Sequence, residues 1–319
     1  MVMENRNRYR PEGGWLETPE NQKLTATVTG LMQARDEGIV LEAKAVRCDV
    51  EHNLWVQFPF GEGFIPREEG AVGIAEGTAR DIVLITRVNR PVCFLVTGFE
   101  QTPEGCRPVL SRRAAQEKCR EEYISRLRLG DVIPAHITRL ETFGAFCDIG
   151  CGLPALLPIA DMSISRISHP RDRFITGMDI LGVVSSLEPG RICISHRELL
   201  GTWEENAARF TVGETVTGLV RSVEPYGIFV ELAPNLAGLA EPKEGVQVGQ
   251  QAAVFIKSMQ PEKLKVKLSL IDVQESRVCP REPQYFITEG PLTYWRYSPA
   301  VCDRVVESRF GNGAETAKI

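Results

Sequence analysis

The chain has 319 residues, of which 43% are hydrophobic and 25% charged, with a formal net charge of −5 and a pI near 5.6. This composition is typical of a globular protein of two or three domains and excludes a fibrous, collagen-like or mainly disordered chain. The apolar runs fall far short of the ~20 residues that span a bilayer, and the polar start lacks the apolar segment of a secretory signal. We therefore expect no membrane contact and a cytoplasmic location.

The chain begins with an irregular stretch and a first β-rich unit. Residues 1–23 carry Pro11, Gly13 and Gly14 and are expected to form a flexible N-terminal arm. Residues 24–111 contain short β-rich segments separated by Gly, Pro and Asp, which is the pattern of strands joined by turns. Five strands are predicted, at 38–48, 54–58, 63–66, 92–99 and 107–111.

Two helical connectors are predicted further along the chain. Residues 112–129 lack Gly and Pro and are rich in helix formers, which predicts a connector helix. A shorter stretch, 198–210, is expected to form a second helical linker. The apolar residues of the first connector recur every four positions and form one stripe that can pack on a neighbouring unit: Ala115, Cys119, Tyr123 and Leu127.

The stretches 130–197 and 211–273 repeat one another. The sequence Phe-Gly-Ala-Phe, which begins at Phe143, recurs 83 residues later as Tyr-Gly-Ile-Phe, which begins at Tyr226. The glycine after each first aromatic residue is typical of a strand bend where a barrel turns a corner. Both stretches are therefore expected to fold in the same way.

All three β-rich units close on a similar strand: Arg107-Pro-Val-Leu-Ser, Arg191-Ile-Cys-Ile-Ser and Lys265-Val-Lys-Leu-Ser. Three aligned endings indicate three copies of one unit. Five short strands in about 70 residues can protect their edges by closing into a barrel, and the five-stranded Greek-key version is the OB-fold. We therefore expect an all-β protein of three consecutive five-stranded OB-fold barrels joined by short helical connectors.

Residues 274–319 form a C-terminal extension that is too rich in aromatic residues for a plain disordered tail. These residues are Tyr285, Phe286, Tyr294, Trp295 and Tyr297. We expect the extension to dock on the third barrel, with residues 311–319 frayed.

The sequence lacks the usual catalytic and metal-binding signatures. It has no Gly-x-x-x-x-Gly-Lys-Ser/Thr loop, no Gly-x-Ser-x-Gly elbow and no His-Glu-x-x-His pair, and its four histidines are isolated. The nine cysteines are scattered without a Cys-x-x-Cys pair, which disfavours zinc ribbons and disulfide frameworks. We expect no enzymatic activity, no catalytic residue, no metal and no cofactor.

Over residues 24–273 the chain resembles the RNA-binding domain named after ribosomal protein S1. The pattern of that family is a Gly-Asp/Glu-x-Val start, a Phe-Gly-x-Phe second strand, a Gly-Leu-x-Pro/His turn and a basic-x-x-Leu/Ile-Ser fifth strand. Repeats two and three match most of this pattern. The whole chain resembles the short, multi-repeat S1-like proteins of Gram-positive bacteria.

In that family, one barrel face contacts single-stranded RNA through the aromatic residues of the second strand and a basic residue of the fifth. The resemblance therefore implies Phe143, Phe146 and Arg191 in the second repeat and Tyr226, Phe229 and Lys265 in the third. The first repeat has His52 and Trp55 at the aromatic positions, which implies weak RNA binding there. Its Glu62-Gly-Phe-Ile-Pro turn resembles the leading repeat of ribosomal S1 proteins, which implies docking on the small ribosomal subunit through protein contacts.

The physical chemistry of these residue types is compatible with that role. Exposed rings stack on any unpaired base while nearby cations meet phosphate, so affinity arises without sequence recognition. The loop between the third and fourth strands of the second repeat is a candidate extension of this phosphate track, the alternative being a solvated loop. Its candidate residues are Arg166, His169, Arg171 and Arg173.

Two functional hypotheses follow. The first is a non-enzymatic binder of single-stranded RNA that holds mRNA near the small (30S) ribosomal subunit in translation, as an S1-like factor. The second is an adaptor or scaffold in RNA turnover or transcription whose barrels mainly bind protein. We expect a monomer, with relative motion of the barrels.

Overall fold

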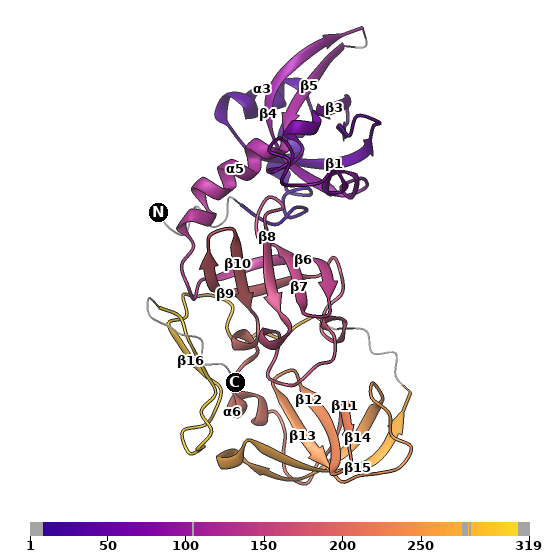
Figure 1. The fold of residues 1–319 in the computed structure, drawn as a ribbon, viewed down its shortest axis with the longest axis vertical. Coiled ribbons are helices and arrows are strands. Elements are labelled where there is room, and N and C mark those ends of the chain that lie inside the picture. Colours follow the sequence, from indigo (N-terminus) through magenta and orange to yellow (C-terminus); the bar gives the residue numbers. More distant parts are fainter. Residues whose placement is uncertain (1–8, 104, 276–279, 281, 312–319) are drawn as a thin grey trace. The chain divides into compact units, whose positions relative to one another are not determined.

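The computed structural model describes residues 9–103, 105–275, 280 and 282–311. It divides into two compact units. Figure 1 shows the ribbon with its helices and strands labelled. Unit 1 contains the chain up to Leu127 together with residues 148–154, and unit 2 contains the remaining residues. The structure has three closed five-stranded barrels, so the predicted all-β fold of three OB-type barrels is confirmed.

The first barrel has the strand order β1-β2-β3-β5-β4, closed by pairing of β4 with β1. Neighbouring strands are antiparallel except for β3 and β5, which are parallel. The core is filled by the inward side chains of alternating strand positions, such as Leu54, Val56 and Phe58. The elements are β1 (Leu41–Cys48), β2 (Leu54–Phe58), β3 (Gly61–Ile65), η1 (Arg67–Glu69), α4 (Ile82–Ile85), β4 (Pro91–Thr102) and β5 (Gly105–Ser111).

The second barrel repeats this topology in the order β10-β8-β7-β6-β9, with β8 and β10 parallel. Its elements are β6 (Val132–Glu141), β7 (Gly144–Asp148), β8 (Pro154–Pro158), η3 (Ile159–Asp161), η4 (Pro170–Asp172), β9 (Asp179–Glu188) and β10 (Arg191–Ser195). The third barrel has the order β11-β12-β13-β15-β14, with β13 and β15 parallel. Its elements are β11 (Thr215–Glu224), β12 (Gly227–Ala233), β13 (Leu236–Ala240), β14 (Gln251–Gln260), η6 (Pro261–Lys263) and β15 (Lys265–Gln274).

The N-terminal residues differ from the expected flexible arm, because residues 9–23 are folded. Two helices, α2 (Pro19–Thr25) and α3 (Val28–Glu37), precede the first barrel. Glu12 is buried, and its carboxylate accepts hydrogen bonds from Arg112 Nε at 2.6 Å and Nη2 at 3.0 Å. A charge-assisted pair of this kind fixes residues 9–23 to the end of the first barrel, since Arg112 directly follows β5. Proline and glycine here form a turn rather than a mobile linker.

The connector after the first barrel is shorter than the predicted helix over 112–129. The helix α5 (Arg112–Glu122) starts at the N-cap Ser111, whose hydroxyl accepts the N–H of Ala114, and a short η2 (Ile124–Arg126) follows it. The predicted apolar stripe is buried along its whole length, at Ala115, Cys119, Tyr123 and Leu127. Packing of this stripe, rather than helix propensity, therefore holds the connector in place.

The linker between the second and third barrels also forms two short helical pieces. They are η5 (Arg197–Leu200) and α6 (Trp203–Ala207), the latter with a capping box between Thr202 and Glu205. The Trp203 ring is buried in the hydrophobic cluster of the third barrel. This linker is therefore part of the packed structure of unit 2.

The C-terminal extension contacts the second barrel as well as the third. It forms a two-stranded sheet of β16 (Tyr294–Arg296) and β17 (Glu307–Arg309). Phe310 packs against Val132 and Val183 of the second barrel. Tyr297 Oη donates to the carbonyl of Asn235 in the third barrel at 2.5 Å. The extension therefore holds the two barrels of unit 2 together, while most of the residues expected to fray, 312–319, lie outside the described residues.

Candidate nucleic-acid interface

The predicted aromatic pairs lie together on the outside of the second and third barrels. The rings of Phe143 and Phe146 have centroids 6.0 Å apart and cross at 88°, and those of Tyr226 and Phe229 lie 6.2 Å apart at 86°. Phe143 is 54% exposed and Tyr226 66% exposed, whereas the second ring of each pair is half-buried. Each pair therefore presents one free ring supported by the edge of another.

The glycine between the two aromatic residues makes this arrangement possible. A Cβ on Gly144 would lie 2.5 Å from the carbonyl oxygen of Leu157, and one on Gly227 would lie 2.6 Å from that of Ala240. Any larger residue would push the second strand away from the third. Gly144 and Gly227 therefore allow the second strand of each barrel to lie close to the third. The two aromatic residues of each pair lie in this closely packed region.

Strand register places one row of side chains across the second, third and fifth strands of each barrel. In the third barrel the row is Phe229, Leu239 and Lys267. In the first it is Trp55, Phe64 and Val109. In the second barrel, Leu156 and Cys193 are paired, and the repeat places Phe146 in the same row.

The predicted fifth-strand cations begin the fifth strand in both barrels of unit 2. Arg191 and Lys265 are exposed and lie two residues before the row, so they project from the same side of their strands as its members. Lys267 lies in the row itself, is exposed, and was not among the predicted residues. The sequence indicates this residue as well, because Lys265 and Lys267 lie two positions apart in one strand and therefore on the same side of it.

The basic loop of the second barrel is divided by the fold. Arg166 and Arg171 are exposed, and the ring of His169 caps the N-terminus of η4 by accepting the N–H of Arg171 at 3.1 Å. Arg173, in contrast, is buried and forms an ion pair with Glu231 of the third barrel. Its guanidinium is engaged within the protein, so only the other three loop residues remain candidates for contact with phosphate.

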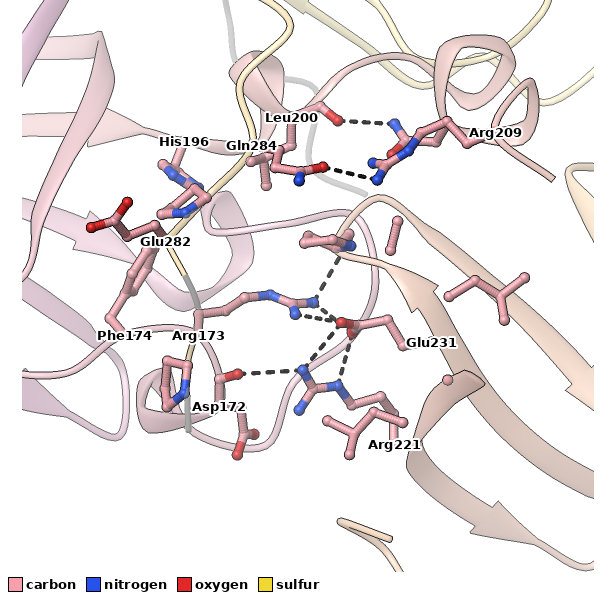
Figure 2. Close-up of a pocket in the computed structure, with 18 of the residues that line it drawn as sticks. Asp172, Arg173, Phe174, His196, Leu200, Arg209, Arg221, Glu231, Glu282 and Gln284 are labelled. Atoms are coloured by element: carbon pink, nitrogen blue, oxygen red, sulfur yellow. Dashed lines mark hydrogen bonds and ion pairs between the residues drawn. The ribbon is translucent and has the colours of Figure 1, made fainter. Parts of the chain in front are cut away.

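Arg173 belongs to a buried ion cluster between the second and third barrels (Figure 2). Its Nη1 and Nη2 atoms lie 2.5 and 2.6 Å from the Glu231 carboxylate, and Arg221 Nε binds the same carboxylate at 2.8 Å. Burial raises the pKa of Glu231, but hydrogen bonds and the charges of both arginines outweigh it and hold the pKa below its usual range. The cluster fixes the loop of one barrel on the other.

A cavity of about 600 Å³ adjoins this cluster. Its lining includes Arg209 and Gln284, and Arg209 Nη2 donates to Gln284 Oε1 at 2.8 Å. Three of the arginines around the cavity are thus engaged with other protein groups: Arg173 and Arg221 with Glu231, and Arg209 with Gln284, as the dashed lines in Figure 2 show. We assign this region a role in joining the two barrels.

His196 lies in the same junction as a neutral, fully hydrogen-bonded ring. Its Nδ1 is 3.0 Å from the carbonyl of Met162, which can only accept, so Nδ1 carries the proton. Its Nε2 is 3.2 Å from the hydroxyl of Tyr285, which in turn accepts the N–H of Leu181 at 2.9 Å. Burial, aided by the charge of Arg173, lowers the pKa of His196 to about 4.

This lowered pKa predicts a pH-dependent stability of unit 2. The unfolded chain, with an ordinary value of 6.5, binds the His196 proton more tightly than the folded protein does. The contribution of His196 to the free energy of unfolding is therefore fully present above pH 6.5. It is lost as the pH drops towards 4 and below, by about 3 kcal/mol in total. Urea unfolding of His196→Gln, which retains a donor and an acceptor, should show a correspondingly flatter pH profile. An identical profile in both proteins would contradict the assignment.

The first barrel presents its aromatic residue differently. The guanidinium of Arg47 lies 3.8 Å from the ring centroid of Trp55, and that of Arg107 lies 5.0 Å away. Phe64 packs beside the same ring at 5.2 Å, and the indole N–H donates to Asp49 at 2.9 Å. Trp55 is thus covered by cations of its own barrel, unlike the exposed rings of Phe143 and Tyr226.

The family comparison matches the repeat at the centre of the chain. Residues 126–196 match the family described as the S1 RNA binding domain. The matched residues include the whole of the second barrel. The first and third barrels share the strand order of this S1 barrel, and the third also shares its aromatic pair.

Several curated proteins similar to this chain are bacterial ribosomal proteins. Small ribosomal subunit protein bS1 of Leuconostoc lactis is 32% identical over 178 residues, which are 54% of this chain and 39% of that protein. The protein of the same name from Staphylococcus aureus (strain COL) is 32% identical over 113 residues, 34% of this chain and 29% of the relative. The chain thus matches less than half the length of these relatives.

Among solved structures, a multidomain protein with nucleic acid binding domains from Streptococcus pneumoniae is 14% identical, with a TM-score of 0.25 and 73% of each chain covered. No helix in the described part of the chain is long and apolar enough to cross a membrane. Within the described ranges, no three His, Cys, Asp or Glu side chains are placed to hold a metal ion.

Proposed function

We propose that this protein binds single-stranded RNA without catalysing a reaction. The binding surfaces are the aromatic faces, which we define as the barrel faces that carry Phe143 and Phe146 in the second barrel and Tyr226 and Phe229 in the third. The observation that carries the proposal is the recurrence of one geometry in two barrels: an exposed ring, a second ring 6.0 or 6.2 Å away, and a basic residue at the start of the fifth strand. The S1 family match and the bS1 relatives support it. Lys267 joins the proposed contacts because it shares a row with Phe229.

The mode of binding follows from these groups. An exposed ring stacks on an unpaired base, and each such stack contributes about 1–3 kcal/mol whatever the base. Arg191, Lys265 and Lys267 neutralise backbone phosphate, as do Arg166 and Arg171 of the loop, with His169 beside them. Since a duplex hides the faces of its bases, binding should favour single strands over double strands.

The names of the relatives point to a place for this activity. We propose that the protein acts as a monomer in the cytoplasm, on mRNA, as an S1-like factor of the small ribosomal subunit. The first barrel is the proposed docking module, because the faces of Trp55 are occupied by Arg47 and Arg107. The same observation favours, as a second candidate, an adaptor in RNA turnover or transcription whose first barrel binds another protein.

A titration of the intact protein tests the proposal. A labelled RNA of about 20 nucleotides is longer than the site of one OB barrel and should bind well as a single strand but poorly as a duplex. The logarithm of the affinity should fall linearly with the logarithm of the salt concentration. Equal binding of both forms, or none, would contradict the RNA assignment. Sedimentation with small ribosomal subunits at low salt supports the ribosomal role, and consistent absence from that fraction supports the adaptor.

A further inference from the structure

The hairpin between the fourth and fifth strands borders the proposed RNA face, and its charge differs among the barrels. Strand register aligns residues 98–109, 186–193 and 258–267 as equivalent segments. The described residues of the first segment include one arginine and one glutamate, those of the second one arginine and one glutamate, and those of the third three lysines and one glutamate. Positive charge at this edge is therefore greatest in the third barrel.

Direct cross-strand neighbours reinforce this difference. Arg107 is paired with Glu100, and Arg191 with Glu188, across their hairpins. The equivalent partner of Lys265 is Gln260, which carries no charge. Directly opposed side chains have their Cβ atoms about 5 Å apart, so a glutamate there competes with phosphate for the neighbouring cation.

The fifth-strand position of the row also differs among the barrels. It is Val109 in the first barrel, Cys193 in the second and Lys267 in the third. Lys267 is exposed and Cys193 is half-buried. Burial raises the pKa of the Cys193 thiol above its ordinary value of 9.0, so this group is neutral at pH 7. Of the three fifth-strand positions in the row, only the one in the third barrel thus holds a cation.

The aromatic positions also favour the third barrel. The outer position is His52 in the first barrel, Phe143 in the second, which is 54% exposed, and Tyr226 in the third, which is 66% exposed. The inner ring of the first barrel, Trp55, is covered by two arginines. Ring exposure and hairpin charge are independent observations, and both favour the third barrel.

We propose that RNA affinity is graded along the chain, with the third barrel as the primary site, the second as an auxiliary site and the first making no stacking contact. Lys267 and Gln260 strengthen the primary site, whereas Cys193 and Glu188 weaken the auxiliary one. The inference rests on the proposed function. A short RNA therefore occupies the third barrel, and a longer RNA extends onto the second.

Full-length variants with a labelled single-stranded RNA of about 8 nucleotides, the size of one barrel site, test this order. Lys267→Gln should weaken binding about fivefold and reduce the slope of log affinity against log salt by about 0.7, the value for one lost phosphate contact with a single strand. Lys23→Gln, which makes the same charge change on α2, should leave both quantities unaltered. Arg191→Gln should have little effect on the short RNA and a larger one on an RNA of about 20 nucleotides.

The reverse change should strengthen the second barrel. Glu188→Gln, alone and with Cys193→Lys, should tighten binding of the longer RNA and steepen its salt dependence, with thermal melting confirming that each variant folds. The grading is overturned if Lys267→Gln behaves like Lys23→Gln, or if Arg191→Gln has the larger effect on the short RNA. If the unaltered protein binds neither RNA, the proposed function itself fails, which is a distinct outcome.

Discussion

Replacing Glu231 by alanine is expected to lower the free energy of unfolding of unit 2 by about 3–5 kcal/mol. The Glu231 carboxylate receives Arg173 at 2.5 and 2.6 Å and Arg221 at 2.8 and 3.2 Å, and the side chains of Glu231 and Arg173 are less than a tenth exposed. Removing the carboxylate leaves one buried and one mostly buried guanidinium group without an anion, which costs far more than the loss of a surface ion pair.

Urea unfolding followed by tryptophan fluorescence measures this loss, because Trp203 and Trp295 are buried in the hydrophobic cluster of the third barrel. Glu224→Ala, a change of the same type at the end of the neighbouring strand β11, is the matched control and should alter stability by less than about 0.5 kcal/mol. A loss below about 1 kcal/mol in Glu231→Ala would show that the cluster does not fasten the two barrels.

Removing all four rings of the proposed faces is expected to weaken binding of single-stranded RNA about 30-fold or more. The variant carries Phe143→Ala, Phe146→Ala, Tyr226→Ala and Phe229→Ala. Loss of only one stacked base in each barrel, at about 1–3 kcal/mol per base, already amounts to about 2 kcal/mol, and a tenfold change in affinity corresponds to about 1.4 kcal/mol. Fluorescence anisotropy with a labelled RNA measures the change.

Two double variants test whether the loss of binding is specific to the rings of the aromatic faces. Because Phe146 and Phe229 are half-buried, the double variant Phe143→Ala with Tyr226→Ala removes only exposed rings and should still weaken binding about tenfold. Phe60→Ala with Tyr294→Ala, which removes exposed rings outside the faces, should bind as the unaltered protein does. Equal losses in the two double variants would contradict a site at the aromatic faces.

The barrels could be predicted from the sequence because their signals are local. The aromatic-Gly-x-Phe pattern and the alternation within each strand report which side chains face inward, and the structure places Gly144 and Gly227 where a Cβ would meet the next strand. Lys267 was missed although its signal was local too, since Lys265 and Lys267 both alternate with buried neighbours. Strand register was needed to show which of them shares a row with Phe229.

The long-range contacts could not be predicted in this way. Glu12 looked like part of a mobile arm because its partner, Arg112, lies 100 residues away. Arg173 looked like a phosphate contact because Glu231, which neutralises it, lies 58 residues further on in another repeat. A charged residue in a loop has the same sequence appearance whether it faces solvent or a buried counter-charge, so only the tertiary structure distinguishes the two.

The most direct test of RNA binding at the aromatic faces is photo-crosslinking of the intact protein to single-stranded RNA containing 4-thiouridine, with the crosslinked peptides identified by mass spectrometry. Crosslinks are expected on the peptides that carry Phe143 and Phe146, Tyr226 and Phe229, and the fifth-strand cations. The third barrel should carry more crosslinks than the second when the RNA is short. Crosslinks confined to the first barrel or to the C-terminal extension would contradict binding at the aromatic faces.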